Sequence, residues 1–319
     1  MSALPRVGFV GAGVMGLPMA RRLLSAGYPI SVHARTPAKV AALTDAGATL
    51  ADTPAQLAAA SDVLVGCLLD EKAVHAIYHG SDGLFAGIRA GHLLVEHGTL
   101  APRVARALAA RASELDAGFL DIPVTGGPRR AHEGRLTGMA GGQPEHLDTV
   151  RPLVGTYCSE LLHLGPSGAG LQIKMVNQLL VSVHVAAAAE AAALLGRLGL
   201  DAARAKTVLM SGWAAGAMLD YCLPAALTPS TAPSGATIGG LLPVQEQVAE
   251  ALAEVDLDAP VFHTAHQVFA ALAGSGGSAL DLAQLARAYD RDSPVTGPGR
   301  HGVPGSGVLS PAATSAVRR

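Results

Sequence analysis

Short runs of apolar residues alternate with helical stretches along the first half of the chain. Five of these runs have the length of buried strands, at residues 6–10, 29–33, 63–68, 92–96 and 119–122. Alternation of this kind is typical of a parallel sheet that is covered by helices on both faces. The pattern therefore predicts an α/β, doubly wound parallel sheet that occupies residues 1–163.

The strand pattern disappears at about Ser167, and helical periodicity dominates from there to about Asp290. We therefore predict a second, all-helical domain over residues 164–290, which opens with a long helix between the domains. Residues 179–195 in this helix are nearly all apolar, but they are mostly alanine and include two ionisable residues. A membrane span needs about 20 predominantly apolar residues with few charges. A long buried helix is therefore predicted instead.

Composition narrows the classes of protein that are expected. The net charge of −2 does not favour binding to nucleic acid or to an acidic membrane surface. The three cysteines form no CxxC pair, which favours a reducing cytoplasm over a disulfide framework or a zinc site. No signal peptide pattern precedes the first strand, so a cytoplasmic location is expected. Residues 291–319 are rich in proline, glycine and serine and are predicted to be disordered.

Two histidine pairs have a spacing that could suit a metal ion, His75 with His79 and His263 with His266. Neither pair has a convincing third ligand in the sequence. We interpret all four as ordinary surface or half-buried histidines, and no metal site is predicted.

A glycine-rich turn follows the first predicted strand. Its three glycines match the pattern GxGxxG, and a helical pattern follows before the second strand. In this context the first glycine permits a tight turn, the second lets the backbone approach a pyrophosphate, and the third allows close helix packing. The helix N-terminus adds free N–H groups and a partial positive charge. The sequence therefore predicts a dinucleotide-binding turn made of Gly11, Gly13, Val14, Met15 and Gly16.

The end of the second predicted strand carries basic and hydroxyl residues instead of an acid. NAD enzymes tend to place an acidic residue there for the ribose hydroxyls, whereas this chain has Arg35, Thr36 and Lys39. Arg35 and Thr36 could bind a 2′-phosphate by charge-assisted hydrogen bonds, which contribute about 1.5–3 kcal/mol each. The sequence therefore favours NADP, with NAD as the less favoured cofactor. The alternative is that Arg35 and Lys39 only form a solvated face.

Lys174 and Asn177 stand three residues apart in the first turns of the long helix. The chain contains only four lysines, so a lysine here does not simply follow from composition. Residues at i and i+3 share a helix face, which lets both side chains point into one cleft. A protonated lysine can give its proton to a carbonyl oxygen while the amide holds the substrate. The alternative is that Lys174 pairs with a carboxylate such as Asp121.

Together these motifs resemble the β-hydroxyacid dehydrogenases, the family that includes 3-hydroxyisobutyrate dehydrogenase and tartronate semialdehyde reductase. Residues 8–20, 121–127 and 165–177 are similar to the cofactor, substrate and catalytic motifs of this family, with Lys174 at the position of the catalytic lysine. The resemblance extends from about residue 6 to residue 290. It implies a Rossmann-type domain followed by an all-helical domain, and a homodimer or homotetramer joined by the helical domains.

The chain departs from the family pattern at three places. Thr125 stands where serine is usual, and Gly98–Thr99 stands where the family usually has Ser–Thr. The family also carries a Lys–Asp pair that opens a later helix, and this pair falls on Pro243–Val244. Imine reductases share the fold and the Arg–Thr element but typically lack a lysine at the position of Lys174. The lysine therefore argues against that branch without excluding imine substrates.

The resemblance implies a role for each motif. Lys174 is the general acid in reduction and the base in oxidation, and Asn177 orients the substrate or the lysine. The substrate carboxylate is held by Thr125, Gly126 and Gly127. The pyrophosphate of the cofactor lies at residues 13–15 and its 2′-phosphate at Arg35 and Thr36, while the nicotinamide side is bordered by Leu68, Leu69 and Thr99.

The predicted function is hydride transfer between NADP(H) and a small hydroxy acid or the matching aldehyde- or keto-acid. Small molecules are the predicted partners, with no nucleic acid and no membrane. Two alternatives stay open. Loss of the Lys–Asp pair makes that part of the site more apolar, which favours bulkier or non-carboxylate substrates, including imines. The same loss is compatible with a protein that binds NADP without turnover. As a separate alternative, Thr125 could be a simple turn former.

Overall fold

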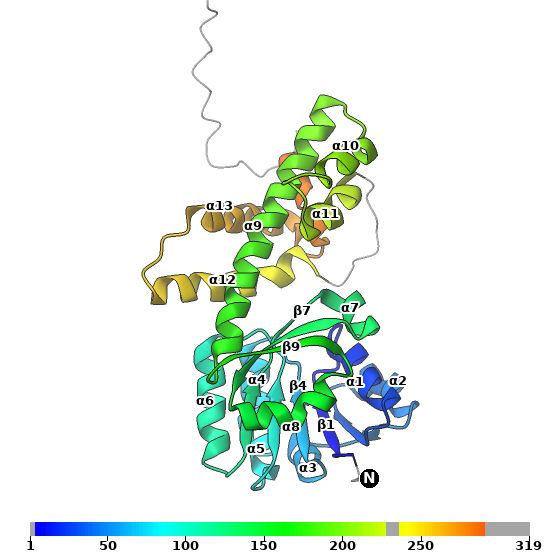
Figure 1. Cartoon of the computed structure of the whole chain (residues 1–319), viewed down its shortest axis with the longest axis vertical. Helices are drawn as coiled ribbons and strands as arrows, with labels where there is room; N and C mark the ends of the chain where they lie inside the picture. The colour runs from blue at the N-terminus through cyan, green and yellow to red at the C-terminus, as the bar shows by residue number, and fades with distance from the viewer. Residues whose placement is uncertain (1–3, 228–235, 291–319) are drawn as a thin grey trace, which may run out of the picture.

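The computed structural model describes residues 4–227 and 236–290 (Figure 1). The predicted disordered tail lies outside these residues. The first part of the chain forms a sheet with helices on both faces, and the second part is helical and is reached through one long helix. The predicted α/β fold with an all-helical second part is therefore confirmed.

One sheet of nine strands organises the first part. Its order is β3-β2-β1-β4-β5-β6-β8-β7, with β9 paired to β8. Strands β1 to β6 are parallel, as predicted. The strands are β1 (Val7–Val10), β2 (Ile30–His33), β3 (Thr49–Leu50), β4 (Val63–Gly66), β5 (Leu93–Glu96), β6 (Gly118–Asp121), β7 (Val124–Thr125), β8 (Leu136–Gly142) and β9 (Cys158–Gly165).

Alternate residues of these strands build two cores, because successive side chains point to opposite faces of a sheet. Phe9 of β1 lies in one core and Val10 lies in the other. The first core packs against α1 (Gly16–Ser25) and α8 (Pro144–Val154). The second core packs against α3 (Pro54–Ala59), α4 (Glu71–His79), α5 (Leu84–Gly87) and α6 (Pro102–Ser113).

The far edge of the sheet adds strands to the predicted parallel sheet, and some of them are antiparallel. Strand β8 runs antiparallel to both β6 and β7, and none of β7, β8 and β9 was predicted. Strand β8 is rich in glycine, which is depleted in strands and hides the pattern. Its glycines allow close approach: a Cβ atom at Gly141 would lie 2.6 Å from Oδ1 of Asp121.

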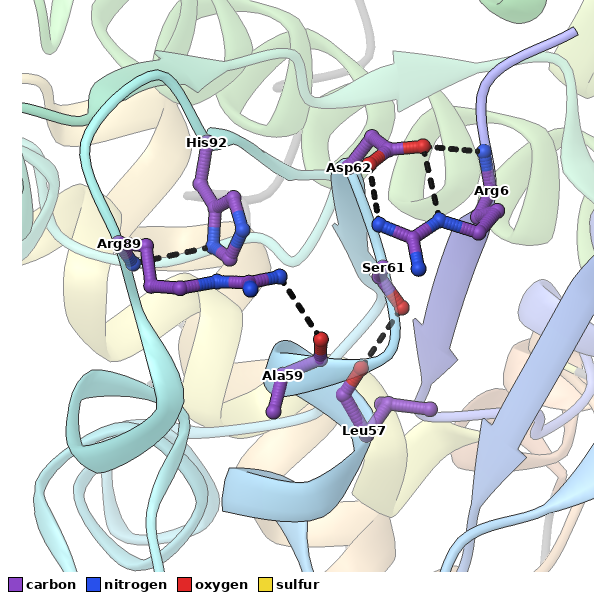
Figure 2. Close-up of polar contacts among 7 residues, drawn as sticks. All are labelled: Arg6, Leu57, Ala59, Ser61, Asp62, Arg89 and His92. Carbon is purple, nitrogen blue, oxygen red and sulfur yellow. Dashed lines mark hydrogen bonds and ion pairs between the residues drawn. The ribbon is translucent and has the colours of Figure 1, made fainter. Parts of the chain in front are cut away.

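Polar contacts close the amino edge of the sheet (Figure 2). The Asp62 carboxylate accepts hydrogen bonds from the backbone N–H and the guanidinium of Arg6, which ties the start of β1 to the start of β4. Hydrogen bonding to Arg6 lowers the pKa of Asp62 to about 2. Arg89 donates to the Ala59 carbonyl on the same edge. These contacts lie at the end of the strands opposite to the predicted site.

The long helix α9 (Ala169–Leu198) leads into the helical part (Figure 1). Its inner side packs against three helices and a 3₁₀ segment, which together form two small cores. The remaining elements are η1 (Pro37–Val40), α2 (Ala41–Thr44), α7 (Gly127–Glu133), α10 (Ala202–Leu209), α11 (Ala217–Leu227), α12 (Ile238–Glu254), α13 (Pro260–Leu272), η2 (Ala273–Gly277) and η3 (Leu282–Tyr289).

Helix α9 is long, as predicted, but it is not buried on all sides. Only 28% of its most apolar window is buried, and by length and composition alone the helix could cross a membrane. Its exposed apolar residues recur at helical spacing, which places them along one side. We call this set the α9 stripe, and it consists of Ile173, Val176, Leu180, Leu194 and Leu198. The prediction of a buried helix was wrong here, because alanine-rich sequence conceals which face packs.

Candidate active site

The glycine turn after β1 has three different local environments. A Cβ atom at Gly11, whose φ is +82°, would collide with the backbone carbonyl of Cys67. At Gly16 it would collide with the Gly11 carbonyl and touch the Phe9 ring. At Gly13 it would meet no atom within 4 Å. Neighbouring atoms therefore crowd the turn at Gly11 and Gly16 and leave it open at Gly13, beside the N-terminus of α1, where a pyrophosphate would be accommodated.

Val14 and Met15 complete this turn. Val14 is exposed, whereas Met15 is half-buried and packs against the core. The backbone closes through two hydrogen bonds, from Gly13 N–H to the Gly11 carbonyl and from Leu17 N–H to the Gly13 carbonyl. These contacts define the shape of the turn, and the cofactor role of its five residues stays a prediction.

Arg35 and Thr36 follow the end of β2 and are exposed. Among the described residues, Arg35 makes no hydrogen bond and no ion pair that would neutralise its charge. The Thr36 backbone begins η1, and its hydroxyl makes no capping hydrogen bond. Both side chains are therefore available to an anionic group, and no acidic residue stands between β2 and η1.

The ends of β4 and β5 lie side by side. Leu68 is buried, Leu69 is exposed and Thr99 is half-buried. The link between these two ends is Glu96, whose carboxylate accepts hydrogen bonds from the N–H groups of Leu68 and Gly98. The predicted residues on both strand ends are therefore held by a buried acid that the sequence pattern did not single out.

His97 makes the next connection along the sheet edge. Its Nδ1 lies 2.7 Å from the Ile122 carbonyl and its Nε2 lies 2.9 Å from the Tyr157 hydroxyl. A carbonyl can only accept, so Nδ1 carries the proton and Nε2 accepts from the tyrosine. Burial lowers the pKa of His97 to about 4, which keeps the ring neutral at physiological pH. His97 thereby joins the ends of β5 and β6.

Lys174 lies beside the predicted substrate motif. Its Nζ donates a hydrogen bond of 2.8 Å to the Val124 carbonyl, one residue before Thr125. The side chain is 8% exposed, and burial lowers its pKa to about 8. Within the described part of the chain it forms no ion pair, so the alternative pairing with Asp121 is not found. A buried ammonium without a counter-ion is poised to lose its proton.

Asp121 instead holds the start of α9. Its two carboxylate oxygens accept from the N–H groups of Gly168 and Leu171, at 2.7 and 3.0 Å. These N–H groups belong to the first turn of the helix, where no intrahelical acceptor exists. Burial raises the pKa of Asp121. The acid thus connects the end of β6 to the helix that carries Lys174.

Thr125 ends β7, Gly126 is the N-cap of α7, and Gly127 is the first residue of that helix. Thr125 is half-buried and pairs with Thr137 of β8. The two glycines have φ values of +129° and +72°, a region that L side chains rarely adopt. A Cβ atom at Gly127 would meet nothing within 4 Å. The backbone at Gly127 therefore borders open space, two residues beyond the Val124–Thr125 strand whose Val124 carbonyl binds Lys174.

Asn177 lies one turn further along α9. Its Oδ1 is buried and has no hydrogen-bond partner among the described residues. No hydrogen bond joins Asn177 to Lys174 in this part of the chain. A buried acceptor without a donor is unfavourable, and a ligand that donates a hydrogen bond would satisfy it.

Pro243 and Val244 lie inside α12. Pro243 is exposed, and Val244 is half-buried against the core of the helical part. The polar residue in this stretch is the next one, Gln245, which is fully buried. Nδ1 of His266 in α13 donates to Oε1 of Gln245. Nε2 of Gln245 has no partner within the described residues. Sequence reasoning passed over Gln245 because a glutamine on an amphipathic helix resembles a solvated position.

No group of three or more metal-ligating side chains gathers in the described residues. Two of the four histidines considered above are ring neighbours, His75 and His79, whose centroids lie 5.5 Å apart.

Comparison with known proteins places this geometry in a family. Residues 6–165 match the NAD binding domain of 6-phosphogluconate dehydrogenase, and residues 168–289 match the model described as NAD-binding of NADP-dependent 3-hydroxyisobutyrate dehydrogenase. An L-threonate dehydrogenase from Cupriavidus necator is 31% identical over 85% of this chain and 92% of the relative. The chain belongs to the β-hydroxyacid dehydrogenase family.

Two further relatives support this assignment. An NAD-dependent L-serine dehydrogenase from Pseudomonas aeruginosa is 39% identical over 62% of this chain and 67% of its own length. The solved structure of Psf3 in complex with NADP+ and 2-OPP is 30% identical, with a TM-score of 0.84 over 89% of this chain and all of that one. The protein is therefore an NAD(P)-dependent oxidoreductase of the dehydrogenase type.

Three polar residues of this dehydrogenase were not among the predicted site residues: Glu96, His97 and Asp121. Each stands at the end of a buried parallel strand or directly after it. Charged residues are rarely fully buried unless they are paired. An acid that ends an apolar strand is therefore a sequence signal that could have revealed Glu96 and Asp121.

Proposed function

We propose that this dehydrogenase transfers hydride between NADP(H) and a small hydroxy acid, or the matching aldehyde- or keto-acid, with Lys174 as the acid–base group. The observation that carries the proposal is the buried Lys174 ammonium, hydrogen-bonded to Val124 beside Thr125. The relatives of this protein that are named for L-serine and L-threonate support a small hydroxy acid as substrate.

The chain's own residues divide the work of this reaction. NADPH, when bound, supplies the hydride. Lys174 gives its proton to the oxygen of the substrate carbonyl as negative charge develops there. The hydrogen bond to the Val124 carbonyl orients the ammonium for this transfer. Neutral Lys174 accepts that proton in the oxidative direction. The substrate carboxylate is held by the Thr125 hydroxyl and the N–H groups of Gly126 and Gly127.

NADP is the proposed cofactor because Arg35 and Thr36 are exposed and unpaired within the described residues. A 2′-phosphate would receive charge-assisted hydrogen bonds there, whereas NAD would leave the arginine without a partner. The glycine turn at Gly13 accepts either cofactor, so the preference depends on the end of β2.

A reductase of bulkier or non-carboxylate substrates, imines included, is the second candidate. It is favoured by α12, where Pro243 and Val244 supply no charge for a small polar substrate. Activity measured with aryl and imine substrates beside small keto-acids would separate the second candidate from the first.

A homodimer or homotetramer is part of the proposal. The α9 stripe exposes apolar side chains along one side of the helix, and exposed apolar patches of this kind mark interaction surfaces. A second copy of the chain is the proposed occupant, because association through the helical part would cover the stripe and leave the glycine turn accessible.

Substitution of Lys174 tests the catalytic assignment. Lys174→Ala is expected to lower turnover by about 10²–10⁴-fold, because it removes the proton donor, while NADPH binding is retained. Oxidation of NADPH would be followed by absorbance with glyoxylate, succinic semialdehyde and tartronate semialdehyde as substrates. Lys206→Ala is the matched control, since Lys206 pairs with Asp220 on an exposed surface of the helical part. A loss below about tenfold would contradict general acid catalysis.

The pH dependence follows from the lowered pKa of Lys174, about 8. Reduction requires the protonated lysine, so kcat/KM for reduction is expected to stay level below pH 8 and to fall as pH rises above it. Oxidation requires the neutral lysine, so its kcat/KM is expected to rise through the same range. Initial rates in both directions between pH 6 and 10 would provide this check. A reductive profile that stays level to pH 10 would exclude Lys174 as the proton donor.

The cofactor preference is tested at Arg35. Arg35→Ala is expected to raise the Kd of NADPH by about ten- to a hundredfold, because one charge-assisted bond to the 2′-phosphate is lost. The Kd of NADH should stay unchanged. Fluorescence titration of both cofactors would measure this, with Arg21→Ala, an exposed arginine of α1, as the control. Equal effects on the two cofactors would argue against 2′-phosphate recognition.

The oligomer is tested on the α9 stripe. Wild-type protein is expected to elute with the mass of a dimer or tetramer in light scattering, and the double change Val176→Glu with Leu180→Glu should lower that mass. Val255→Glu, exposed at the end of α12 and outside the stripe, is the control. Elution of the wild type as a monomer would refute the proposed assembly.

A further inference from the structure

Glu96 is a fully buried acid whose role the proposed chemistry does not explain. It ends β5 in register with Gly66 of β4, and it is 1% exposed. Among the described residues it forms no ion pair with a lysine, arginine or histidine. Such a group is costly to bury unless its oxygens are satisfied, so its hydrogen-bond partners indicate what it does.

The partners of Glu96 come from both neighbouring strand ends. Oε1 accepts from the N–H of Gly98 at 2.7 Å and from the N–H of Leu68 at 3.1 Å. Oε2 accepts from the Tyr78 hydroxyl of α4 at 2.9 Å. One carboxylate thus joins the chain after β4, the chain after β5 and a helix that covers the sheet.

Two glycines leave space for this carboxylate. A Cβ atom at Gly66 would collide with Oε2, and a Cβ atom at Gly98 would lie 2.7 Å from Oε1. The backbone therefore approaches the acid from both strands more closely than any other residue type would allow. Gly98, which departs from the serine usual in the family, is required by this contact.

The two N–H groups lie where the ladder between β4 and β5 has ended. Gly66 and Glu96 are the last paired residues, and Leu68 and Gly98 follow beyond them. Parallel strands separate after their last ladder bond unless another group connects them. The Glu96 side chain supplies that connection, and the connected segments are those assigned to the nicotinamide side, Leu68–Leu69 and Thr99.

We propose that Glu96 is a positioning residue that holds the segments after β4 and β5 at the spacing required by the nicotinamide half of the cofactor. This inference rests on the proposed function, because it assigns the two segments to the cofactor. Glu96 touches neither substrate nor reacting atoms in this role and acts through the backbone at Leu68 and Gly98.

The side-chain chemistry suggests how to separate charge from geometry. All three partners donate, so the ionised acid satisfies them together, although burial raises the pKa of Glu96. In Glu96→Gln the amide oxygen can replace Oε1, and the amide N–H can donate to the Tyr78 oxygen. Glutamine therefore keeps the connection, whereas alanine removes it.

The test compares three variants of the full chain. Glu96→Ala is expected to raise the Kd of NADPH by about tenfold or more, because two backbone donors lose their acceptor and the segments loosen. Glu96→Gln should stay within about threefold of wild type, since one hydrogen-bond geometry is exchanged for another. Leu57→Ala is the control for lost stability, because Leu57 is fully buried in the core that includes Tyr78, and no hydrogen bond joins Leu57 to Glu96 in the described part of the chain.

Fluorescence titration gives the Kd, and amide hydrogen exchange without cofactor gives a second readout. Glu96→Ala should accelerate exchange at Leu68 and Gly98 and over the residues that follow them, while Leu57→Ala should not. Unchanged exchange and Kd in Glu96→Ala would overturn the inference. Equal effects of Leu57→Ala on both readouts would also overturn it, since lost stability alone would then explain the effects of Glu96→Ala.

The two readouts also separate this inference from the proposed function. Failure of the wild type to bind NADPH would refute the proposed cofactor, and the assignment of the segments to the nicotinamide would fail with it. Exchange would then still decide whether Glu96 holds the two strand ends. Tight binding by the wild type with no effect of Glu96→Ala would leave the proposed function standing and refute the positioning role alone.

Discussion

The contact between Asp121 and the first turn of α9 determines how the two parts of this protein meet. The carboxylate satisfies two N–H groups that a helix N-terminus leaves without acceptors. It also fixes where α9 leaves the sheet and how the helix is rotated about its own axis. Lys174 lies one and a half turns later, so this contact decides that its ammonium meets the Val124 carbonyl. A Cβ atom at Gly141 would lie 2.6 Å from Oδ1 of Asp121, and one at Gly170 would lie 2.9 Å from Oδ2, so both glycines let the backbone approach this carboxylate closely.

The carboxyl edge of the sheet is held by a succession of buried polar side chains. Glu96 joins the ends of β4 and β5, His97 joins β5 to β6, and Asp121 joins β6 to α9. Each satisfies backbone groups that lie beyond the last ladder bonds. Hydrogen bonds in a water-poor interior are strong when complete and costly when broken. An edge organised in this way is ordered before any ligand arrives, which reduces the entropy lost on binding.

The helical part is less constrained by polar contacts. Its cores are built from alanine, leucine and phenylalanine side chains, and α9 contributes small residues that let neighbouring helices approach. Three amide side chains, those of Asn177, Gln245 and Gln247, keep a buried atom without a partner within the described residues. Unsatisfied buried polar atoms are rare in folded proteins. Asn177 lies one turn beyond Lys174 on α9, where a bound substrate would supply the missing donor.

Local patterns in the sequence determined much of this protein. The first five predicted strands, the glycine turn and the helix carrying Lys174 were evident because each depends on residues close together in the chain. Strands β7 to β9 were not, because glycine-rich strands lack apolar alternation and owe their stability to neighbours distant in sequence. The exposed α9 stripe was also hidden, since alanine fits both a packed and an open helix face. Only the tertiary structure decided the partner of Lys174, the depth of its burial and the contacts of Glu96. Those properties arise where the ends of separate strands converge. Burial there shifts a pKa or leaves a polar group without a partner, and no local pattern encodes either effect.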